Sequence, residues 1–257
     1  MILALDIGNS NIKIGVFQND ELLFSWRLAA RSDKTADEYG IVLTDLLEHS
    51  GITPNDTEGI IMSSVIPNLN YTLEHMCSYY FHKKPIVIGP GVKNGINIKY
   101  ENPKEVGSDR IINAVAAYNT YGGPSIVIDF GTATTFTVIN ENADFLGGAI
   151  TLGIKVSMDA LVSNTAKLPK IELVEPSSVI GKTTVQNMQS GLIYGTIGQV
   201  KYIIEKIKEE LNAPAKVIAT GGLSELVANE GIIDTIDRTL SLRGLNIIYN
   251  LNKKENR

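Results

Sequence analysis

The sequence predicts an α/β protein built from two related lobes, because a segment near its start is repeated in its middle. Residues 3–17 and 126–139 each contain an apolar run, Asp-x-Gly, small polar residues and a second apolar run. β-type stretches and helical patterns follow each copy. The copies are too far apart for a solenoid repeat, so they indicate a duplicated domain. We expect lobes at 1–115 and 116–257, with a nucleotide in the cleft between them.

Composition indicates a globular protein of a reducing compartment. The chain is 44% hydrophobic and 20% charged, and its net charge of −5 argues against a nucleic-acid-binding surface. One cysteine excludes an internal disulfide, and three scattered histidines disfavour a zinc cluster. The sequence shows neither a signal peptide nor an apolar run of membrane length. We therefore expect a cytoplasmic protein with no nucleic-acid or membrane partner.

The first copy predicts a hairpin suited to phosphate. Asp6 ends an apolar run, where a carboxylate needs a cation or hydrogen-bond donors to offset desolvation. Gly8 allows the backbone to approach a ligand closely, and Lys13 on the second strand supplies a cation. The polar turn residues, whose amides and side chains can donate to phosphate oxygens, are Asn9, Ser10 and Asn11.

An ordinary hairpin with an Asn-rich turn is the alternative, and the second copy weighs against it. There Asp129 and Gly131 repeat the Asp-x-Gly, and Thr132 opens a run of small hydroxyl residues. Two such hairpins, each starting a lobe, favour a nucleotide site over two unrelated turns.

The remaining elements follow from local patterns. Thr35 is the expected cap of a helix, Pro67 opens another, and Gly51 follows the end of the first. Residues 145–154 are expected to continue a strand into a loop, and a polar segment follows. The other predicted elements are strands at 22–28, 59–65, 85–88 and 214–219, helices at 32–50, 67–81, 108–118, 184–211 and 240–251, and a loop at 89–102.

Asp109 lies at the expected start of a helix, where a carboxylate is stabilised by the helix dipole. Capping alone would explain it. Three neighbours favour a catalytic role instead: Gly107 leaves space beside it, Arg110 can pair with it or with a ligand, and Tyr100 offers an aromatic wall. An ionised carboxylate beside a polar substrate is a candidate base for deprotonating an alcohol.

Two later segments carry weaker signals. Gly181-Lys182-Thr183 resembles part of a Walker loop. The earlier glycine that such a loop requires is missing, because position 176 is Pro176, and no strand precedes the segment. We therefore reject that interpretation. The glycines of Thr220-Gly221-Gly222 would let an adenine lie against the backbone, or simply form a strand-to-helix turn. Gly191, Gly195 and Gly198 thin one side of the 184–211 helix, for packing either within the lobe or against a second subunit.

The chain resembles the superfamily of acetate kinase, sugar kinases, chaperone ATPases and actin, through Asp6-Ile7-Gly8, Asp129-Phe130-Gly131 and Thr220-Gly221-Gly222. Within that superfamily it is similar to type III pantothenate kinases over nearly its whole length. The further matching segments are residues 63–67, 106–110, 147–150 and 180–184, of which Gly107-Ser108-Asp109-Arg110 is the most specific. The resemblance implies duplicated ribonuclease-H-like, actin-like ATPase domains with mixed sheets flanked by helices.

The resemblance also implies an activity: phosphorylation of pantothenate by ATP, the first step of coenzyme A biosynthesis, by a homodimer. Asp6 would help to hold magnesium, Asp109 would be the base, and Asp129 would bind a monovalent cation, K⁺ or NH₄⁺. The residues expected to bind ATP are Asp6, Gly8, Asn9, Ser10, Asn11, Lys13 and Thr132. The residues expected to bind pantothenate are Tyr100, Gly107, Ser108, Asp109, Arg110 and Thr184.

Departures from the family pattern are mild. Ser10 replaces a more usual Thr and keeps the hydroxyl, Leu152 stands where Pro is expected, and Thr137 stands where Asp is frequent. Two other functions compete: a phosphatase or polyphosphate hydrolase of the same superfamily, and a non-catalytic accessory factor in transcription. The candidate pocket for an organic substrate around Tyr100 and Asp109 disfavours the hydrolase, and the acidic charge and intact carboxylates disfavour the accessory factor.

Overall fold

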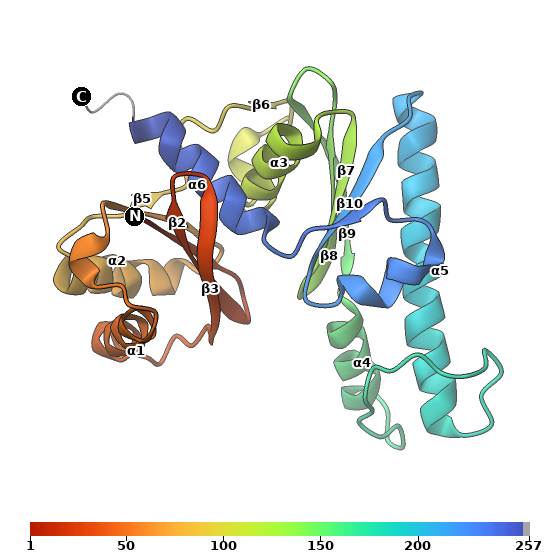
Figure 1. The fold of residues 1–257 in the computed structure, drawn as a ribbon. Helices are drawn as coiled ribbons and strands as arrows, with labels where there is room; N and C mark the ends of the chain where they lie inside the picture. Colours follow the sequence, from red (N-terminus) through yellow and green to blue (C-terminus); the bar gives the residue numbers. More distant parts are fainter. Residues whose placement is uncertain (254–257) are drawn as a thin grey trace. The chain divides into compact units, whose positions relative to one another are not determined.

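The first hairpin belongs to a sheet formed by β1 (Ile2–Ile7), β2 (Asn11–Gln18), β3 (Glu21–Ala29), β4 (Gly59–Ser64) and β5 (Ile86–Val87) (Figure 1). The computed structural model describes residues 1–253, except for the side chains of residues 228 and 229. The strand order is β3-β2-β1-β4-β5. β1 pairs antiparallel with β2 and parallel with β4, so it is a central strand.

The helices that pack with this sheet are α1 (Ala36–His49), α2 (Pro67–Phe81), α3 (Ser108–Tyr121) and α6 (Leu240–Lys253). Alternate residues of β1 face two hydrophobic clusters, as expected for a strand covered on both faces. Leu3 and Leu5 pack with buried residues of α1 and α2, whereas Ala4 packs with those of α3 and α6. Asp6 continues the row of Ala4, so its carboxylate lies on the α3 and α6 side.

A second sheet contains the repeated hairpin. Its strands are β7 (Ser125–Phe130), β8 (Ala133–Ile139), β9 (Asp144–Leu152), β10 (Lys216–Gly221), β11 (Thr235–Ile236) and the short β6 (Asn97–Ile98). Its helices are α4 (Ile154–Ser163) and α5 (Thr184–Leu211). Buried residues of both helices pack with Ile126 and Ile128 of β7. Asp129 alternates with Ile128, so its side chain lies on the opposite face of the sheet.

The two sheets share one topology, which confirms the predicted duplicated α/β fold. The second sheet has the order β11-β10-β7-β8-β9-β6. Without β6, its strands correspond one by one to those of the first sheet, with β7 in the place of β1. In both sheets an antiparallel meander of three strands is followed by two parallel strands.

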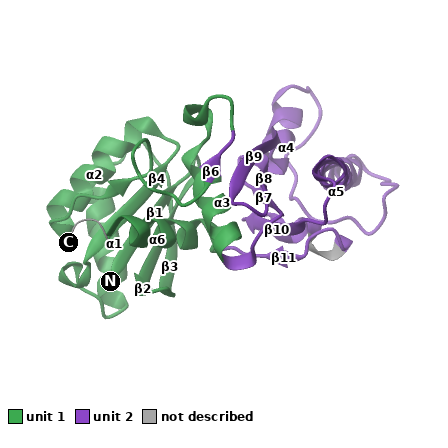
Figure 2. Ribbon diagram, turned by 90° about the horizontal axis from the view of Figure 1, so that it is seen from above, with its two compact units in different colours: residues 1–96, 100–119, 239–257 green, residues 97–99, 120–238 purple. Residues whose placement is uncertain are grey.

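Contacts divide the described chain into two compact units (Figure 2). Among the described residues, one unit contains residues 1–96, 100–119 and 239–253, and the other contains residues 97–99 and 120–238. The lobe limits predicted above, 1–115 and 116–257, differ from these units chiefly because α6 packs with the first sheet. The predicted lobe limits remain a prediction about where one duplicated domain ends and the next begins in the sequence.

Most predicted elements are confirmed, with Thr35 in a capping box with Glu38 and Pro67 at the start of α2. The expectation that the 145–154 strand passes into a loop is wrong, because α4 begins at Ile154. Only Ile154 and Met158 of α4 are buried, which is too short an apolar stripe to be recognised in sequence. The 3-10 turns, also not predicted, are at Pro54–Asp56, Pro103–Glu105 and Ser224–Glu230.

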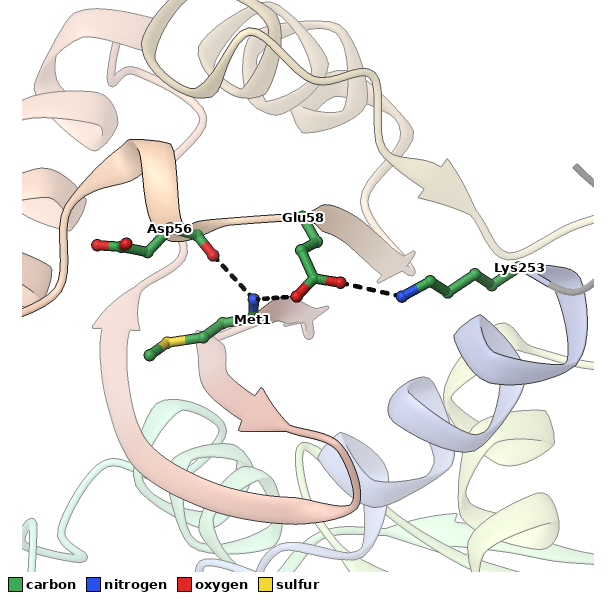
Figure 3. A network of polar contacts seen from close by, with 4 residues as sticks. All are labelled: Met1, Asp56, Glu58 and Lys253. Carbon is green, nitrogen blue, oxygen red and sulfur yellow. Dashed lines mark hydrogen bonds and ion pairs between the residues drawn. The ribbon is translucent and has the colours of Figure 1, made fainter. Parts of the chain in front are cut away.

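Both ends of α6 are attached to the first sheet. Near its end, Lys253 Nζ lies 3.0 Å from Glu58 Oε2, while Glu58 Oε1 accepts from the amino group of Met1 at 3.1 Å (Figure 3). The Met1 amino group also donates to the carbonyl oxygen of Asp56 at 2.8 Å. These contacts therefore attach the end of α6 to the residues that precede β1 and β4.

The glycine side of α5 is open. A Cβ atom built on Gly191, Gly195 or Gly198 would meet no other described atom within 4 Å. Packing of these glycines inside their own lobe is therefore not observed. In the described part of the chain, every helix is too short or too polar to cross a lipid bilayer.

Candidate active site

Asp6 lies in a polar row that crosses the end of the first sheet. Its register partners are Lys13 on β2 and Ser63 on β4. Paired residues on neighbouring strands point to the same face, so all three side chains lie on the side of α3 and α6. Asp6 is only 6% exposed, and Ser63 is fully buried. The strand register therefore supplies what the sequence predicted for Asp6, a cation beside a buried carboxylate.

Lys13 makes two contacts that differ in origin. Its Nζ atom lies 3.5 Å from Asp6 Oδ2 and 3.3 Å from the hydroxyl oxygen of Ser241, the second residue of α6. The first contact follows from the hairpin, whereas the second joins residues 228 positions apart. Nothing in the sequence around Ser241 indicates this contact, which therefore could not be predicted from the sequence.

The turn between β1 and β2 presents polar groups outward. Gly8 donates from its backbone nitrogen to the carbonyl of Asn11 at 2.9 Å, and the side chains of Asn9, Ser10 and Asn11 are exposed. A Cβ on Gly8 would meet only the Asn11 carbonyl, at 3.3 Å, and the backbone is not left-handed there. The fold itself would therefore accommodate a methyl group at this position after a small adjustment. A ligand that approaches the backbone of the turn closely would leave less room for a side chain there.

The start of α3 is attached to the polar row through a pair of serines. Ser63 Oγ donates to Ser108 Oγ at 2.8 Å, and Ser108 Oγ lies 3.2 Å from the carbonyl of Ser64. Ser108 is the first residue of α3, and Asp109 follows it. The contact therefore links the helix that carries Asp109 to the strand beside Asp6.

The Asp109 carboxylate folds back over its own helix start. Its Oδ1 atom accepts a hydrogen bond from the backbone nitrogen of Arg110 at 2.9 Å. A Cβ on Gly107 would collide with Asp109 Oδ1, so glycine at 107 makes this position available. Arg110 is buried, while Asp109 and Tyr100 are half-buried. Gly107 thus has the role that the sequence predicted, to leave space beside Asp109.

The second hairpin repeats the plan with different partners. Asp129 pairs in register with Thr135 on β8 and with Thr220 on β10, so hydroxyl groups stand where the first sheet has Lys13 and Ser63. The Thr220 hydroxyl is fully buried and has no hydrogen-bond partner among the described residues. A buried polar atom of this kind is normally satisfied by an ordered water, a ligand or an ion.

Gly221 packs against the second carboxylate. It has φ +93°, and a Cβ there would lie 2.7 Å from Asp129 Oδ1 and 2.6 Å from the Phe130 carbonyl oxygen. Only glycine fits this position. The packing explains Gly221 without a nucleotide, so an adenine at Thr220-Gly221-Gly222 stays a prediction.

Thr132 and Thr184 also lie in the second unit. Thr132 is exposed, and its carbonyl accepts from the Gly153 nitrogen at 3.0 Å. Thr184 is the exposed first residue of α5, after the cap residue Thr183. Tyr100 and Asp109 belong to the first unit, so a shared pantothenate site with Thr184 stays a prediction.

The carboxylate, imidazole and thiol side chains of residues 1–253 do not by themselves form a metal cluster. No group of three or more His, Cys, Asp or Glu side chains there could hold an ion. Burial raises the pKa of the Cys77 thiol to about 12, which keeps it protonated and unsuited to a metal. A metal at Asp6 would need ligands from a substrate, as Mg²⁺ commonly takes from nucleotide phosphates.

Solved structures share this fold at low sequence identity. A candidate Baf family transcriptional activator from Campylobacter jejuni has 22% identity and a TM-score of 0.61, with 98% of this chain and 99% of that chain covered. Component A of (R)-2-hydroxyglutaryl-CoA dehydratase from Acidaminococcus fermentans has 13% identity and a TM-score of 0.54, with 98% of both chains covered. An inorganic polyphosphate/ATP-glucomannokinase from Arthrobacter sp. strain KM has 12% identity and a TM-score of 0.50, also with 98% of both chains covered.

These likenesses show the fold, which is that of the actin-like ATPases and sugar kinases. The sequence itself matches the family model of type III pantothenate kinase over residues 2–206. That range includes the hairpins of Asp6 and Asp129, the Gly107–Arg110 segment and Thr184. The match makes the protein a kinase, a transferase that binds ATP together with Mg²⁺. The chain belongs to the type III pantothenate kinase family.

Proposed function

We propose that this kinase transfers the γ-phosphoryl group of ATP to the primary alcohol of pantothenate, the reaction that opens coenzyme A biosynthesis. One observation carries the proposal. The Gly107–Arg110 segment, the part of the sequence most specific to the family, starts a helix bonded through Ser108 and Ser63 to the strand pair of Asp6. A candidate base and a candidate phosphate site are thus attached to one sheet.

The first hairpin is suited to the triphosphate. Exposed polar residues of the turn offer donors, and Lys13 supplies a positive charge. Phosphoryl transfer depends mainly on positioning and on neutralising charge, and such groups provide both. Asp6 fits the role of a magnesium ligand, as a single buried carboxylate beside the turn. Magnesium would supply charge neutralisation at the phosphates.

Asp109 is the proposed base. Its carboxylate is half-buried, lies over the Gly107 backbone and accepts one backbone hydrogen bond. It would accept the proton of the pantothenate hydroxyl as oxygen attacks the γ-phosphorus in line. Because the transition state is loose, the base contributes roughly the 10²–10⁴-fold that is typical of general base catalysis. Tyr100, Gly107, Ser108, Arg110 and Thr184 are proposed to bind pantothenate.

The second hairpin suits a monovalent cation, K⁺ or NH₄⁺, at Asp129. The register places the Thr220 hydroxyl next to Asp129, and that buried oxygen has no hydrogen-bond partner among the described residues. Carboxylate and hydroxyl oxygens are the ligands that such hard cations accept. The cation would add positive charge for ATP, and Thr132 is proposed to contact the nucleotide phosphates.

A homodimer is the proposed assembly, with the open glycine side of α5 as its candidate seam. In a single chain no described atom covers Gly191, Gly195 or Gly198. Small residues on a helix allow a second backbone to approach closely.

One assay separates this proposal from its rivals. Purified protein is incubated with ATP, Mg²⁺ and pantothenate, and phosphopantothenate is resolved from inorganic phosphate. We expect phosphopantothenate with little free phosphate. Free phosphate alone would indicate a hydrolase. No turnover of ATP would favour a non-catalytic role, which the C. jejuni structure's description as a transcriptional activator keeps as the second candidate.

A further inference from the structure

We infer that Ser241 is a positioning residue that holds the Lys13 ammonium group toward the phosphates of ATP. The inference rests on the proposed role of the first hairpin in binding ATP. Ser241 lies outside residues 2–206, the range that matches the family model. Its contact adds a contribution from α6 to a polar row that is otherwise formed by β1, β2 and β4.

The contact is buried and polar on both sides. Ser241 is 1% exposed, and the side chains of Lys13 and Asp6 are 19% and 9% exposed. A serine so deeply buried in α6, on a face that packs with apolar residues of β1 and α3, needs a partner for its hydroxyl. Lys13 Nζ lies within 3.3 Å of it.

The distances indicate that Lys13 is shared between two acceptors. Charge-assisted N–H···O bonds are usually about 2.7–2.9 Å long, whereas Lys13 Nζ lies 3.5 Å from Asp6 Oδ2. The Ser241 hydroxyl, at 3.3 Å, is the nearer of the two acceptors. Ser241 thus keeps the ammonium group from closing fully onto Asp6.

The geometry of an ammonium group explains the consequence for ATP. Lysine has three N–H donors and can rotate them about its terminal bond. Contacts with Asp6 and Ser241 occupy two of these directions, and a phosphate oxygen can take the third. Without Ser241, Lys13 would be free to lie closer to Asp6, and its charge would be directed less well at the nucleotide.

The test measures ATP affinity directly, by calorimetric titration of the full-length protein with MgATP in the absence of pantothenate. Ser241→Ala removes one oxygen, and we expect ATP to bind about three- to tenfold more weakly, the range for one long hydrogen bond to a charged group. Ser241→Thr keeps the hydroxyl and should bind within about twofold of wild type. Ser241→Cys, which fills the same space with a weak acceptor, should resemble Ser241→Ala.

A matched control separates positioning from loss of helix packing. Asn246 lies in the same helix, is 2% exposed and donates to the carbonyl of Asn19 at 3.0 Å, away from Lys13. Asn246→Ala should lower the melting temperature and leave ATP affinity within about twofold of wild type. If Asn246→Ala weakens ATP binding as much as Ser241→Ala does, both variants act through the packing of α6. That result would overturn the inference.

A double-mutant cycle makes the test specific to Lys13. In a Lys13→Met background Ser241 has no ammonium group to hold, so Ser241→Ala should no longer change ATP affinity. An equal loss in both backgrounds, or unchanged affinity in Ser241→Ala alone, would contradict the inference. Because no pantothenate is present, the result does not depend on whether pantothenate is the substrate. If the double-mutant cycle gives the expected coupling between Lys13 and Ser241 but pantothenate is not phosphorylated, only the proposed substrate is refuted.

Discussion

The two hairpins have the same strand topology but different neighbours around their carboxylates. Asp6 stands between Lys13 and Ser63 on the adjacent strands, whereas Asp129 stands between Thr135 and Thr220. The first row therefore contains its own cation. The second row offers only hydroxyl groups, one of them buried without a partner among the described residues. Under the proposed function, the first hairpin supplies a fixed positive charge through Lys13, whereas the second would receive its charge from a bound cation.

Gly8 and Gly221, one in each unit, differ in how strictly the fold requires glycine. Gly221 is required by the chain, since any side chain there would meet Asp129 and Phe130. Gly8 would tolerate a Cβ at 3.3 Å from the Asn11 carbonyl with a small adjustment. A glycine that the fold requires indicates packing, while a glycine that the fold barely requires is better explained by a ligand.

The largest expected effect concerns Asp109, the carboxylate attached to the first sheet. Asp109→Asn keeps the size of the side chain and should reduce turnover by roughly 10²–10⁴-fold, because the base is lost. MgATP binding measured by titration should stay near that of wild type. Turnover within threefold of wild type would remove Asp109 from that role and leave it as a helix cap.

The comparison of the two carboxylates predicts different responses to monovalent ions. Wild-type activity should rise steeply, about tenfold, when K⁺ replaces Na⁺, as expected if the ion supplies charge that the second row lacks. Asp129→Ala should abolish this response, and Lys13→Met should retain it at a lower rate. Equal dependence on K⁺ in wild type and in Asp129→Ala would contradict a cation site there.

The two glycines provide a test of fold against ligand. Gly8→Ala should change the melting temperature little and raise the KM for ATP about tenfold, because a methyl group would obstruct the approach of phosphate. Gly221→Ala should instead lower the free energy of unfolding by about 1–3 kcal/mol, from strain at a positive φ and from collision with Asp129. Thermal melts and ATP titrations of both variants check this contrast. A large loss of stability in Gly8→Ala would show that the turn itself requires glycine.

A leucine on the open side of α5 tests the proposed dimer. The single chain has room for a side chain at Gly195, so Gly195→Leu should fold. If this side is the seam, overpacking should weaken the dimer by about 1–3 kcal/mol and lower activity in parallel. Sedimentation velocity over a range of concentrations measures the shift toward monomer. A wild-type protein that sediments as a fully active monomer would rule out the proposed assembly.

The smallest expected effect concerns Glu58, whose pair with Lys253 ties α6 to the first sheet. The hydrogen bond from Lys253, followed by that from the Met1 amino group, holds the pKa of Glu58 below its ordinary value of 4.5. A depressed pKa adds stability above pH 4.5, and this stability is lost as the pH falls through the pKa of the folded state. The pair is exposed, so it contributes at most about 1 kcal/mol.

Glu58→Gln should therefore melt slightly below wild type at neutral pH and converge on it as the pH falls below the pKa of Glu58 in the folded state. Glu48→Gln, which removes an exposed carboxylate from α1, serves as the matched control. A difference between Glu58→Gln and wild type that grows toward low pH would contradict the predicted sign.

Local patterns in the sequence determined the elements and the residue types of the site. Apolar alternation and Asp-x-Gly predicted both hairpins, the repeat predicted the duplicated fold, and Thr35 and Pro67 marked helix starts that the structure confirms. Except for the repeat, these signals each lie within one or two neighbouring elements, where spacing alone specifies which residues share a face. The apolar stripe of α4 was too short to be recognised as helical, so this helix was not predicted.

Only the tertiary structure decided which side chains meet. Ser63 with Ser108, Thr220 with Asp129, and Ser241 with Lys13 join residues from distant segments, and no spacing in the sequence encodes such pairs. They depend on strand register and on which helix covers which face, both set by burial of apolar surface over the whole domain. The sequence therefore identified the carboxylates and the lysine, while the fold chose the hydroxyl groups beside them.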